Sequence, residues 1–275
     1  MVRSLVEADL HTHTLASGHA YSTVAELAAV AGERGVKLLG ITDHGPGLPG
    51  GAHEYHFWNL RVLPRVLKDV AILRGVEANV MGRDGRLDLE EEILAELDVV
   101  AVAFHPYGGL RGETQAECTE IFLAALDNPY ADFVAHPGNP LFRVDVRAVV
   151  EKAKERGIVI EVNNSSFLSS TSRMGAEVLD LDFIIAAGEA GLPLLVNSDA
   201  HFSDHVGRVE AAMALVHEAG YPEELVLSLE ARRVLDYLHS RGRAADISLD
   251  PSGVPVARPL PSAGKQHRPA QGVLE

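Results

Sequence analysis

Short apolar runs alternate with longer amphipathic segments along most of the chain. The seven apolar runs cover residues 5–10, 38–42, 70–80, 99–104, 132–135, 158–162 and 193–196. Their lengths are typical of buried strands, and the segments between them carry helical spacing. This alternation predicts parallel strands with helices on the outside. Seven strands predict an α/β barrel that is one unit short of the eight-stranded form.

Local signals mark several element boundaries. Thr23-Val24-Ala25-Glu26 has the spacing of a capping box, and Gly35 is placed to end the helix that follows. The turn Arg83-Asp84-Gly85-Arg86 predicts a hairpin that extends the third strand. Further helices are expected near 113–126, 144–155 and 176–190 and in segments up to about residue 241.

The composition changes near Ala245. Beyond this residue the chain has little apolar periodicity and contains Gly and Ser. It also contains five prolines, Pro251, Pro255, Pro259, Pro261 and Pro269. Such a segment buries too little apolar surface to offset its ordering entropy. We therefore predict a single barrel domain over 1–244 and a disordered, dispensable tail over 245–275.

Polar side chains that can bind metal follow nearly every predicted strand. They are His11 and His13, Asp43 and His44, Glu77, His105, His136, Asn163 and Asn164, and Asp199 and His201, with His19 in the first loop. Side chains at i and i+2 of a strand share a face, so His11 and His13 can reach one ion. Active sites of α/β barrels lie at the C-terminal ends of the strands. The pattern predicts a metal site there, since imidazole and carboxylate suit zinc, manganese and iron.

Charge and cysteine content narrow the function. The chain has 39 acidic and 24 basic residues and a net charge of −15, which argues against broad contact with nucleic-acid phosphates. A small anionic substrate remains compatible because bound cations can dominate the local field. Cys118 is the only cysteine, so no intramolecular disulfide can form, and we expect it on a helix facing the barrel wall. The sequence shows no signal peptide or long apolar span, so we expect a cytoplasmic protein that does not enter a membrane.

The Gly/Pro-rich segment 45–51 and the residues after it allow two interpretations. His53, His56, Trp58 and Arg61 could form a lid or recognition segment, with Arg61 binding an anionic oxygen. Alternatively they form an ordinary surface loop with Trp58 packed inward. Ser165 and Ser166 lack a G-x-S-x-G motif, so neither is interpreted as a nucleophile.

Together these motifs resemble the polymerase and histidinol phosphatase (PHP) superfamily, and within it the YcdX-type phosphatases. The resemblance spans about residues 5–240 and rests on DLHTH (9–13), ITDHG (41–45), RGVEAN (74–79), FH (104–105), HPGNP (136–140), EVNNSSF (161–167) and NSDAH (197–201). The segments ASGHAYS (16–22) and HFWNLR (56–61) strengthen the match to the subgroup.

The resemblance implies a distorted (β/α)7 barrel that holds three divalent ions, zinc first, with manganese or iron as alternatives. It places the first ion on His11, His13, Glu77 and Asp199, the second on Glu77, His105 and His136, and the third on His19, His44 and His201. Glu77 would bridge two ions. Asp43 is expected to orient His44 or a neighbouring ligand.

The expected function is a phosphatase that hydrolyses a small phosphomonoester by attack of a metal-activated water. Glu77, Asp199 and His44 are the expected catalytic side chains, with His56 and Arg61 as candidate substrate contacts. Three alternatives stay open: a phosphodiesterase or 3′–5′ exonuclease, an amidohydrolase, and a non-catalytic metal-binding or regulatory module.

Overall fold

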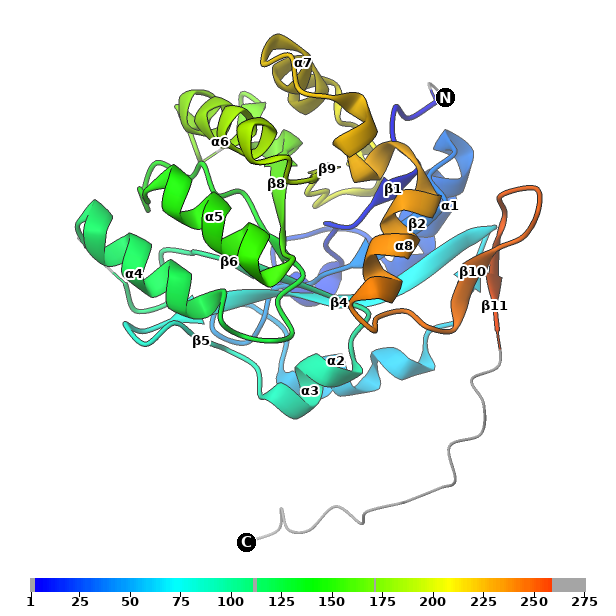
Figure 1. Ribbon diagram of the computed structural model, residues 1–275. Helices are drawn as coiled ribbons and strands as arrows, with labels where there is room; N and C mark the ends of the chain where they lie inside the picture. The colour runs from blue at the N-terminus through cyan, green and yellow to red at the C-terminus, as the bar shows by residue number, and fades with distance from the viewer. Residues whose placement is uncertain (1–2, 111–112, 171, 259–275) are drawn as a thin grey trace, which may run out of the picture.

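Seven parallel strands form the centre of the protein in a computed structural model that describes residues 3–110, 113–170 and 172–258 (Figure 1). Their order around the sheet is β1 (Ala8–Asp9), β2 (Leu38–Ile41), β4 (Val70–Met81), β6 (Val99–Ala103), β7 (Phe133–Val134), β8 (Val159–Asn163) and β9 (Leu194–Asn197). Each of the seven predicted apolar runs overlaps one of these strands, and β4, β8 and β9 each extend one residue beyond the predicted run.

The sheet closes on itself through contacts between the chain after β1 and the chain around β9. Thr12 and Ala200 form a parallel bridge, and Ala200 O accepts a hydrogen bond of 2.9 Å from His13 N. Asn197 Oδ1 accepts a hydrogen bond from Leu10 N at 2.9 Å, so a side chain takes part in closing the barrel between β1 and β9. The prediction of a distorted (β/α)7 barrel is confirmed as a nearly closed barrel.

Helices surround the barrel in the order predicted from the sequence (Figure 1). They are α1 (Val24–Arg34), α4 (Gln115–Ala125), α5 (Val146–Arg156), α6 (Ala176–Ala190), α7 (Glu210–Glu218) and α8 (Ala231–Ser240). Thr23 and Glu26 form the predicted capping box of α1, and Gly35 ends this helix with a left-handed φ of 82°. The predicted hairpin is also present, where β4 pairs with β5 (Arg86–Leu87).

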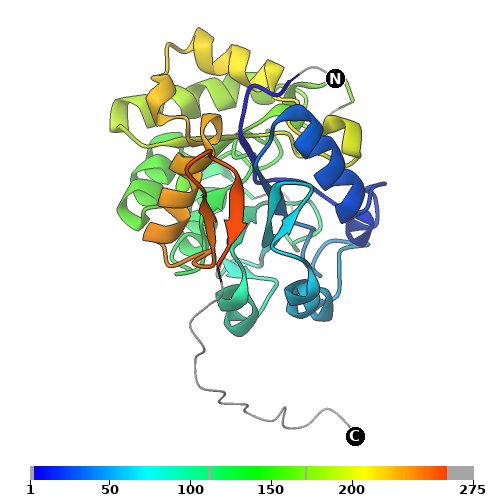
Figure 2. The ribbon, with the colours of Figure 1, turned by 90° about the vertical axis from the view of Figure 1, so that its right-hand side faces the viewer.

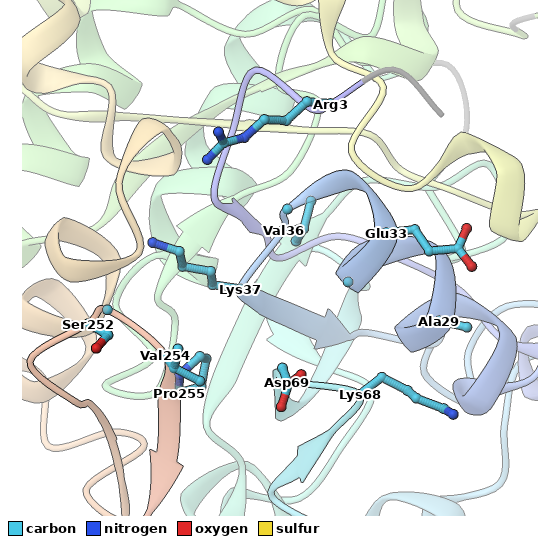
Figure 3. Close-up of a pocket in the computed structure, with 13 residues that line it drawn as sticks. Arg3, Ala29, Glu33, Val36, Lys37, Lys68, Asp69, Ser252, Val254 and Pro255 are labelled. Atoms are coloured by element: carbon cyan, nitrogen blue, oxygen red, sulfur yellow. The ribbon is translucent and has the colours of Figure 1, made fainter.

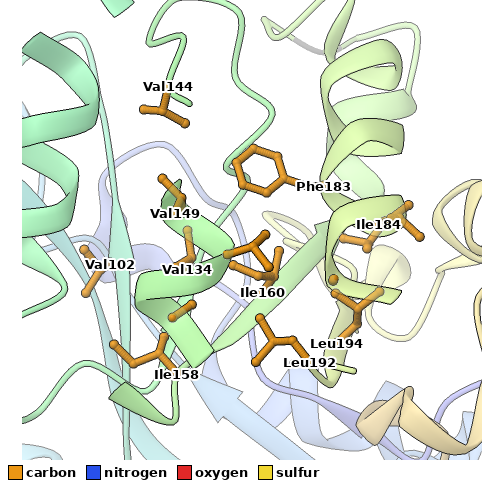
Figure 4. Close-up of a cluster of buried hydrophobic side chains, with 14 of the residues drawn as sticks. Val102, Val134, Val144, Val149, Ile158, Ile160, Phe183, Ile184, Leu192 and Leu194 are labelled. Atoms are coloured by element: carbon orange, nitrogen blue, oxygen red, sulfur yellow. The ribbon is translucent and has the colours of Figure 1, made fainter. Parts of the chain in front are cut away.

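Apolar side chains fill both faces of the barrel wall. On the outside, Phe183 and Ile184 of α6 and Val149 of α5 pack against Val134 and Ile160 (Figure 4). Cys118 of α4 is buried in the same cluster, as predicted. Inside the barrel, inward-facing strand residues pack against α8 through its apolar residues Ala231, Val234, Leu235 and Leu238. Helix α8 follows the last strand and covers the barrel interior, which leaves the C-terminal ends of the strands for the polar residues.

The segment after the Gly/Pro-rich loop folds as α2 (Glu54–Asn59) and the short 3₁₀ helix η2 (Leu60–Val62). Phe57 and Leu60 are buried against Val76 and against Ile93 of α3 (Glu91–Glu96). Trp58 is 40% exposed, so the side chain that anchors this segment is the phenylalanine and not the tryptophan.

The folded domain extends beyond residue 244, where the composition predicted that it would end. β10 (Ile247–Leu249) and β11 (Pro255–Ala257) form an antiparallel hairpin that contacts β4 and β3 (Val66–Leu67) (Figure 2). Asp246 accepts two hydrogen bonds from Arg65, which also pairs with Asp98. A long-range ion pair and burial of Ile247 hold a segment whose composition alone predicts disorder. The rest of the predicted tail, 259–275, lies outside the described residues.

A cavity of about 520 Å³ lies beside this hairpin, at the N-terminal end of β2 (Figure 3). Arg3, Lys37 and Asp69 line it together with Val254 of the hairpin. Lys37 pairs with Glu7 at 2.7 Å, so its charge is compensated locally. None of the nine candidate metal ligands borders this cavity. In the part of the chain that the structure describes, no helix has the length and apolar character needed to span a bilayer.

Candidate metal centre

Nine side chains from six strand ends meet at one mouth of the barrel. His11 and His13 follow β1, His19 lies in the loop beyond them, His44 follows β2, Glu77 lies in β4, His105 follows β6, His136 follows β7, and Asp199 and His201 follow β9. Six of them, including Glu77, are buried. The parallel strands bring these residues together because all of their C-terminal ends face the same opening.

The innermost group surrounds one oxygen of Glu77 and one oxygen of Asp199. His11 Nε2 lies 3.4 Å from Glu77 Oε2 and 3.7 Å from Asp199 Oδ1. His13 Nε2 lies 3.6 Å and 3.2 Å from the same two oxygens. Two imidazole nitrogens and two carboxylate oxygens at these separations form a set that one divalent ion can bind.

The other oxygen of Glu77 faces a second pair of histidines. Glu77 Oε1 lies 2.7 Å from His136 Nε2 and 3.2 Å from His105 Nε2. The two oxygens of this one carboxylate therefore point toward two different groups of nitrogens, as a bridging ligand requires.

A third group lies nearer the cavity. His44 Nδ1 is 2.6 Å from Glu77 Oε2, and the His19 and His201 Nε2 atoms are 3.0 Å apart. The ring of His13 stacks on that of His44 with 4.4 Å between centroids. Burial, followed by the neighbouring His201 and His44, lowers the pKa of both His13 and His19, so these two imidazoles favour the neutral form.

Several of these side chains have buried polar atoms without a hydrogen-bond partner. The atoms are His11 Nε2, His13 Nε2, His44 Nδ1, His136 Nδ1, Glu77 Oε2 and Asp199 Oδ1. An unpartnered polar atom costs free energy when it is buried, and most native structures avoid it. Five of the six atoms belong to the groups described above, so bound cations would satisfy them together. The donor set fits divalent metal ions.

The two buried acids of the centre favour the ionised form. Burial opposes ionisation of Glu77, but His44, His105 and His11 hold the pKa of this carboxyl well below its usual range. Burial likewise opposes ionisation of Asp199, and the nearby His11, His13 and Arg173 outweigh it and lower its pKa. Both groups are therefore available as anionic ligands.

Glu161 in β8 holds His11 in place, and the sequence analysis gave it no role. Glu161 Oε1 lies 2.8 Å from His11 Nδ1, so this nitrogen is held as a donor and Nε2 is left facing the centre. The same carboxylate accepts from His136 N, Asn163 Nδ2 and Asn197 Nδ2 at 2.8–2.9 Å. One acid inside the apolar run 158–162 was the available sequence signal.

We expect Glu161→Gln to weaken metal binding by about ten- to a hundredfold, as is typical when the partner of a metal ligand is lost. All four contacts of Glu161 come from N–H donors. In the glutamine variant, the NH2 group would replace one of the accepting oxygens and would face N–H groups that it cannot accept from. Metal competition titrations measure the effect. Glu155→Gln, at an exposed position of α5, is the control, and equal metal affinity in both variants would contradict this role.

Asp43 acts through Ser17. Its carboxylate accepts hydrogen bonds from Ser17 Oγ at 2.6 Å and from Thr14 N at 2.7 Å. Ser17 Oγ in turn lies 3.0 Å from His13 Nδ1 and accepts from His44 N. Burial opposes ionisation of Asp43, but hydrogen bonds, including one from His56, lower its pKa to about 2. This arrangement agrees with the prediction that Asp43 orients a neighbouring ligand.

Asn79 and Asp88 orient the remaining ligand of the second group. His105 Nδ1 lies 2.6 Å from Asn79 Oδ1, which leaves Nε2 for Glu77 and a metal. The amide group of Asn79 donates to Asp88, which fixes which end of the amide faces the histidine. A Cβ at Gly45 would lie 2.3 Å from the Asp88 carboxylate, so a larger residue there would displace the group that holds Asn79.

Two of the candidate ligands have backbone conformations that are rare for residues other than glycine. His136 has a φ of 32° and Asp199 a φ of 54°. Such conformations carry strain and are often found at functional sites. The hydrogen bond from His136 N to buried Glu161 shows how the surrounding structure holds one of them.

A cavity of about 580 Å³ opens above the cluster. Histidines and Asp199 form its base, and its walls are formed by Leu48, Pro49, Pro106, Tyr107, Ser165, Ser170, Ser172 and Arg173. Arg173, which the sequence analysis did not select, contacts Asp199 Oδ2 at 2.8 Å and Asn163 Oδ1 at 3.1 Å. It places a cation beside the candidate ligands.

The two predicted substrate contacts are placed elsewhere. Arg61 is exposed on η2 and is not among the described residues that line the cavity. His56 points to Asp43 instead, with 3.3 Å between His56 Nε2 and Asp43 Oδ2. Asn163 and Asn164 also have structural partners: Asn163 donates to Glu161 and Asp199, and Asn164 accepts from the start of α7.

This chain is similar to known proteins in sequence and in fold. Residues 9–135 match the PHP domain family. A probable phosphatase of Caldanaerobacter subterraneus subsp. tengcongensis is 46% identical over 233 residues, which cover 85% of this chain and 91% of that protein. A probable phosphatase of Photobacterium profundum is 41% identical over 237 residues, covering 86% of this chain and 95% of that protein.

A solved structure shares the fold. Histidinol phosphate phosphatase from Lactococcus lactis, complexed with zinc, L-histidinol and phosphate, has a TM-score of 0.57 and 18% identity. The similarity covers 78% of this chain and 94% of that chain. The barrel, the polar cluster at its mouth and the extended similarity to probable phosphatases show that this chain belongs to the PHP family.

Proposed function

We propose that this protein is a metal-dependent phosphatase acting on small phosphomonoesters. The observation that carries the proposal is the set of buried, unpartnered nitrogen and oxygen atoms at the base of an open cavity. A cavity of about 580 Å³ suits a small molecule. Relatives named probable phosphatases support the reaction class.

Three divalent ions fit the donor set best. We assign His11, His13, Glu77 and Asp199 to the first, Glu77, His105 and His136 to the second, and His19, His44 and His201 to the third. Glu77 Oε2 lies 3.4 Å from His11 Nε2, and Glu77 Oε1 lies 2.7 Å from His136 Nε2, which supports a first and a second site that share this carboxylate. Zinc is our first choice because it suits imidazole and carboxylate ligands and accompanies the Lactococcus lactis enzyme, with manganese and iron as alternatives.

Bound divalent ions would supply water activation and stabilise the developing charge of a phosphoryl group. The side chains of the chain itself prepare the site for this chemistry. Glu77 and Asp199 contribute negative charge that offsets the cations. Arg173 keeps Asp199 in position and adds positive charge to a cavity that would receive an anion.

A protein nucleophile is not needed in this proposal. Ser166 accepts a hydrogen bond from Arg173 Nε at 2.9 Å, so its hydroxyl faces a cation rather than a base. Ser165 lines the cavity without a histidine partner among the described hydrogen bonds. Among the described residues, neither serine therefore has a neighbouring general base that would activate its hydroxyl as a nucleophile.

The two main alternatives differ in what they would bind. A phosphodiesterase or 3′–5′ exonuclease needs contacts with a polyanionic strand, which the net charge of −15 disfavours. A non-catalytic metal-binding module would need no substrate cavity, yet one opens directly above the cluster.

One assay separates these functions. Metal-replete protein should hydrolyse p-nitrophenyl phosphate at least about tenfold more efficiently than bis(p-nitrophenyl) phosphate, a preference worth about 1.4 kcal/mol. The two esters share a leaving group, so the acidity of the leaving group does not enter the comparison. Dialysis against a chelator should abolish turnover, and added metal should restore it. Preference for the diester would favour a phosphodiesterase or 3′–5′ exonuclease. Inactivity of metal-replete protein on both esters would favour a non-catalytic metal-binding module.

A further inference from the structure

The walls of the cavity differ in chemistry from one side to the other. The loops after β2 and β6, which flank β4 in the barrel, contribute Leu48, Pro49, Pro106 and Tyr107. The loop after β8, on the other arc of the barrel, contributes three serines and Arg173. A molecule in the cavity therefore meets an apolar surface on one side and hydroxyl groups on the other.

Backbone hydrogen bonds hold the loop that forms the apolar wall. Gly108 N donates to His105 O at 3.1 Å and closes a turn with Pro106 and Tyr107 at its centre. Gly108 lies so close to β4 that a Cβ would be 2.4 Å from Val80 O, and Gly108 O accepts from Gly82 N. The backbone at Tyr107 is therefore held two residues from the candidate ligand His105.

The neighbouring part of this wall is fixed in a similar way. Leu48 N donates to Gly45 O at 3.3 Å, and Gly51 N donates to Leu48 O at 2.8 Å. Gly47 N donates to Asp88, which also holds Asn79 of β4. A wall that is ordered before binding loses little entropy when a ligand packs against it.

Tyr107 is 56% exposed, although it borders a cavity. It is also the one aromatic side chain other than histidine among the described residues that line this cavity. An exposed aromatic face beside a candidate reaction centre favours stacking with a planar group. The same described lining contains one carboxylate, Asp199, which Arg173 already pairs, so a positively charged leaving group would find no free partner there.

We propose that the preferred substrates are phosphomonoesters whose leaving group carries an uncharged planar ring, with Tyr107 as the specificity-determining residue. This inference rests on the proposed phosphatase function. The phosphoryl group would lie over the histidine cluster, and the ring would lie against Tyr107 and the prolines beside it. The serines on the other side would accept hydrogen bonds from, or donate them to, substituents on the ring.

The test compares phosphate esters of primary alcohols, so that leaving-group acidity differs little between them. Benzyl phosphate should be hydrolysed with higher kcat/KM than cyclohexylmethyl phosphate and ethyl phosphate. Tyr107→Ala should lower the benzyl-to-ethyl ratio of kcat/KM by about three- to tenfold, the range expected for loss of one aromatic pair. Tyr107→Phe should preserve the ratio. Tyr55→Ala removes an exposed tyrosine outside the cavity and serves as the matched control.

A binding measurement keeps the inference independent of turnover. 2-Phenylethylphosphonate, in which a methylene replaces the bridging oxygen, should bind metal-replete protein more tightly than propylphosphonate in calorimetry, and Tyr107→Ala should remove that difference. Equal ratios in Tyr107→Ala and wild-type protein, or equal affinity for the two phosphonates, would overturn the inference. Failure of all three esters to react would instead overturn the phosphatase proposal, while the phosphonate series would still decide the role of Tyr107.

Discussion

Glu77→Gln should lower kcat/KM for a phosphomonoester by roughly a thousandfold or more, the equivalent of about 4 kcal/mol of transition-state stabilisation. Wild-type protein purified without chelator should carry about three equivalents of divalent metal, and the variant should lose at least one. The side chain is fully buried and faces His44, His105 and His136 at 2.6–3.2 Å. An amide has the same shape but cannot supply the charge that holds two cations together.

The fold should survive this substitution. The backbone of Glu77 is held independently, since its N–H donates to Asp43 O and its carbonyl accepts from Gly45 N. Elemental analysis measures the metal content, steady-state kinetics measures kcat/KM, and circular dichroism shows whether the variant is folded. Glu92→Gln, at an exposed position of α3, is the control. Near-wild-type turnover in metal-replete Glu77→Gln would refute the bridging role, and a fully loaded wild-type protein with a single equivalent would refute the three-ion site.

A chain that ends at Ala245 should be less stable than one that ends at Arg258, by about 3–5 kcal/mol and roughly 10 °C in Tm. The shorter chain lacks Asp246, which pairs with Arg65 at 2.6 Å, and Ile247, which is 1% exposed. Loss of one partner leaves a largely buried arginine less compensated, because only Asp98 remains beside it. It also uncovers apolar surface where β11 contacts β3 and β4.

Both shortened chains lack 259–275, so their comparison isolates the hairpin. Thermal denaturation of the two metal-free proteins gives the difference directly, without a contribution from bound ions. If the two chains melt at the same temperature, the hairpin adds no stability. The stable domain would then end at residue 244, as the composition suggests.

Local sequence signals predicted most of the barrel because the forces that form its elements are themselves local. The capping box at Thr23 and the glycine at position 35 set the limits of α1 through neighbours in the chain. Runs such as 99–104 are apolar throughout because parallel strands are buried on both faces. The hairpin β10–β11 was missed because its order depends on Arg65, which lies 181 residues away from Asp246 in the sequence.

The sequence also predicted that the candidate ligands lie close together, for a related reason. Parallel strands in a barrel all end at one mouth, so a residue just after an apolar run lies near every other such residue. That rule gathers His11, His105 and Asp199 without any knowledge of distances. It does not apply to residues in long loops, so it could not separate Arg61, which lies away from the cavity, from Arg173, which borders it.

Local sequence patterns were enough to predict the seven-stranded barrel, the end of the barrel that carries the candidate site and the residue types available to bind metal. Contacts between distant segments were needed to identify the polar groups that orient those residues and the side chains that form the cavity wall. Glu161 acquires its role from His11, Asn163 and Asn197, and Tyr107 acquires its place from a turn anchored on β4. Such contacts join segments far apart in sequence, and their geometry depends on barrel closure, strand register and loop conformation together, which no local pattern encodes.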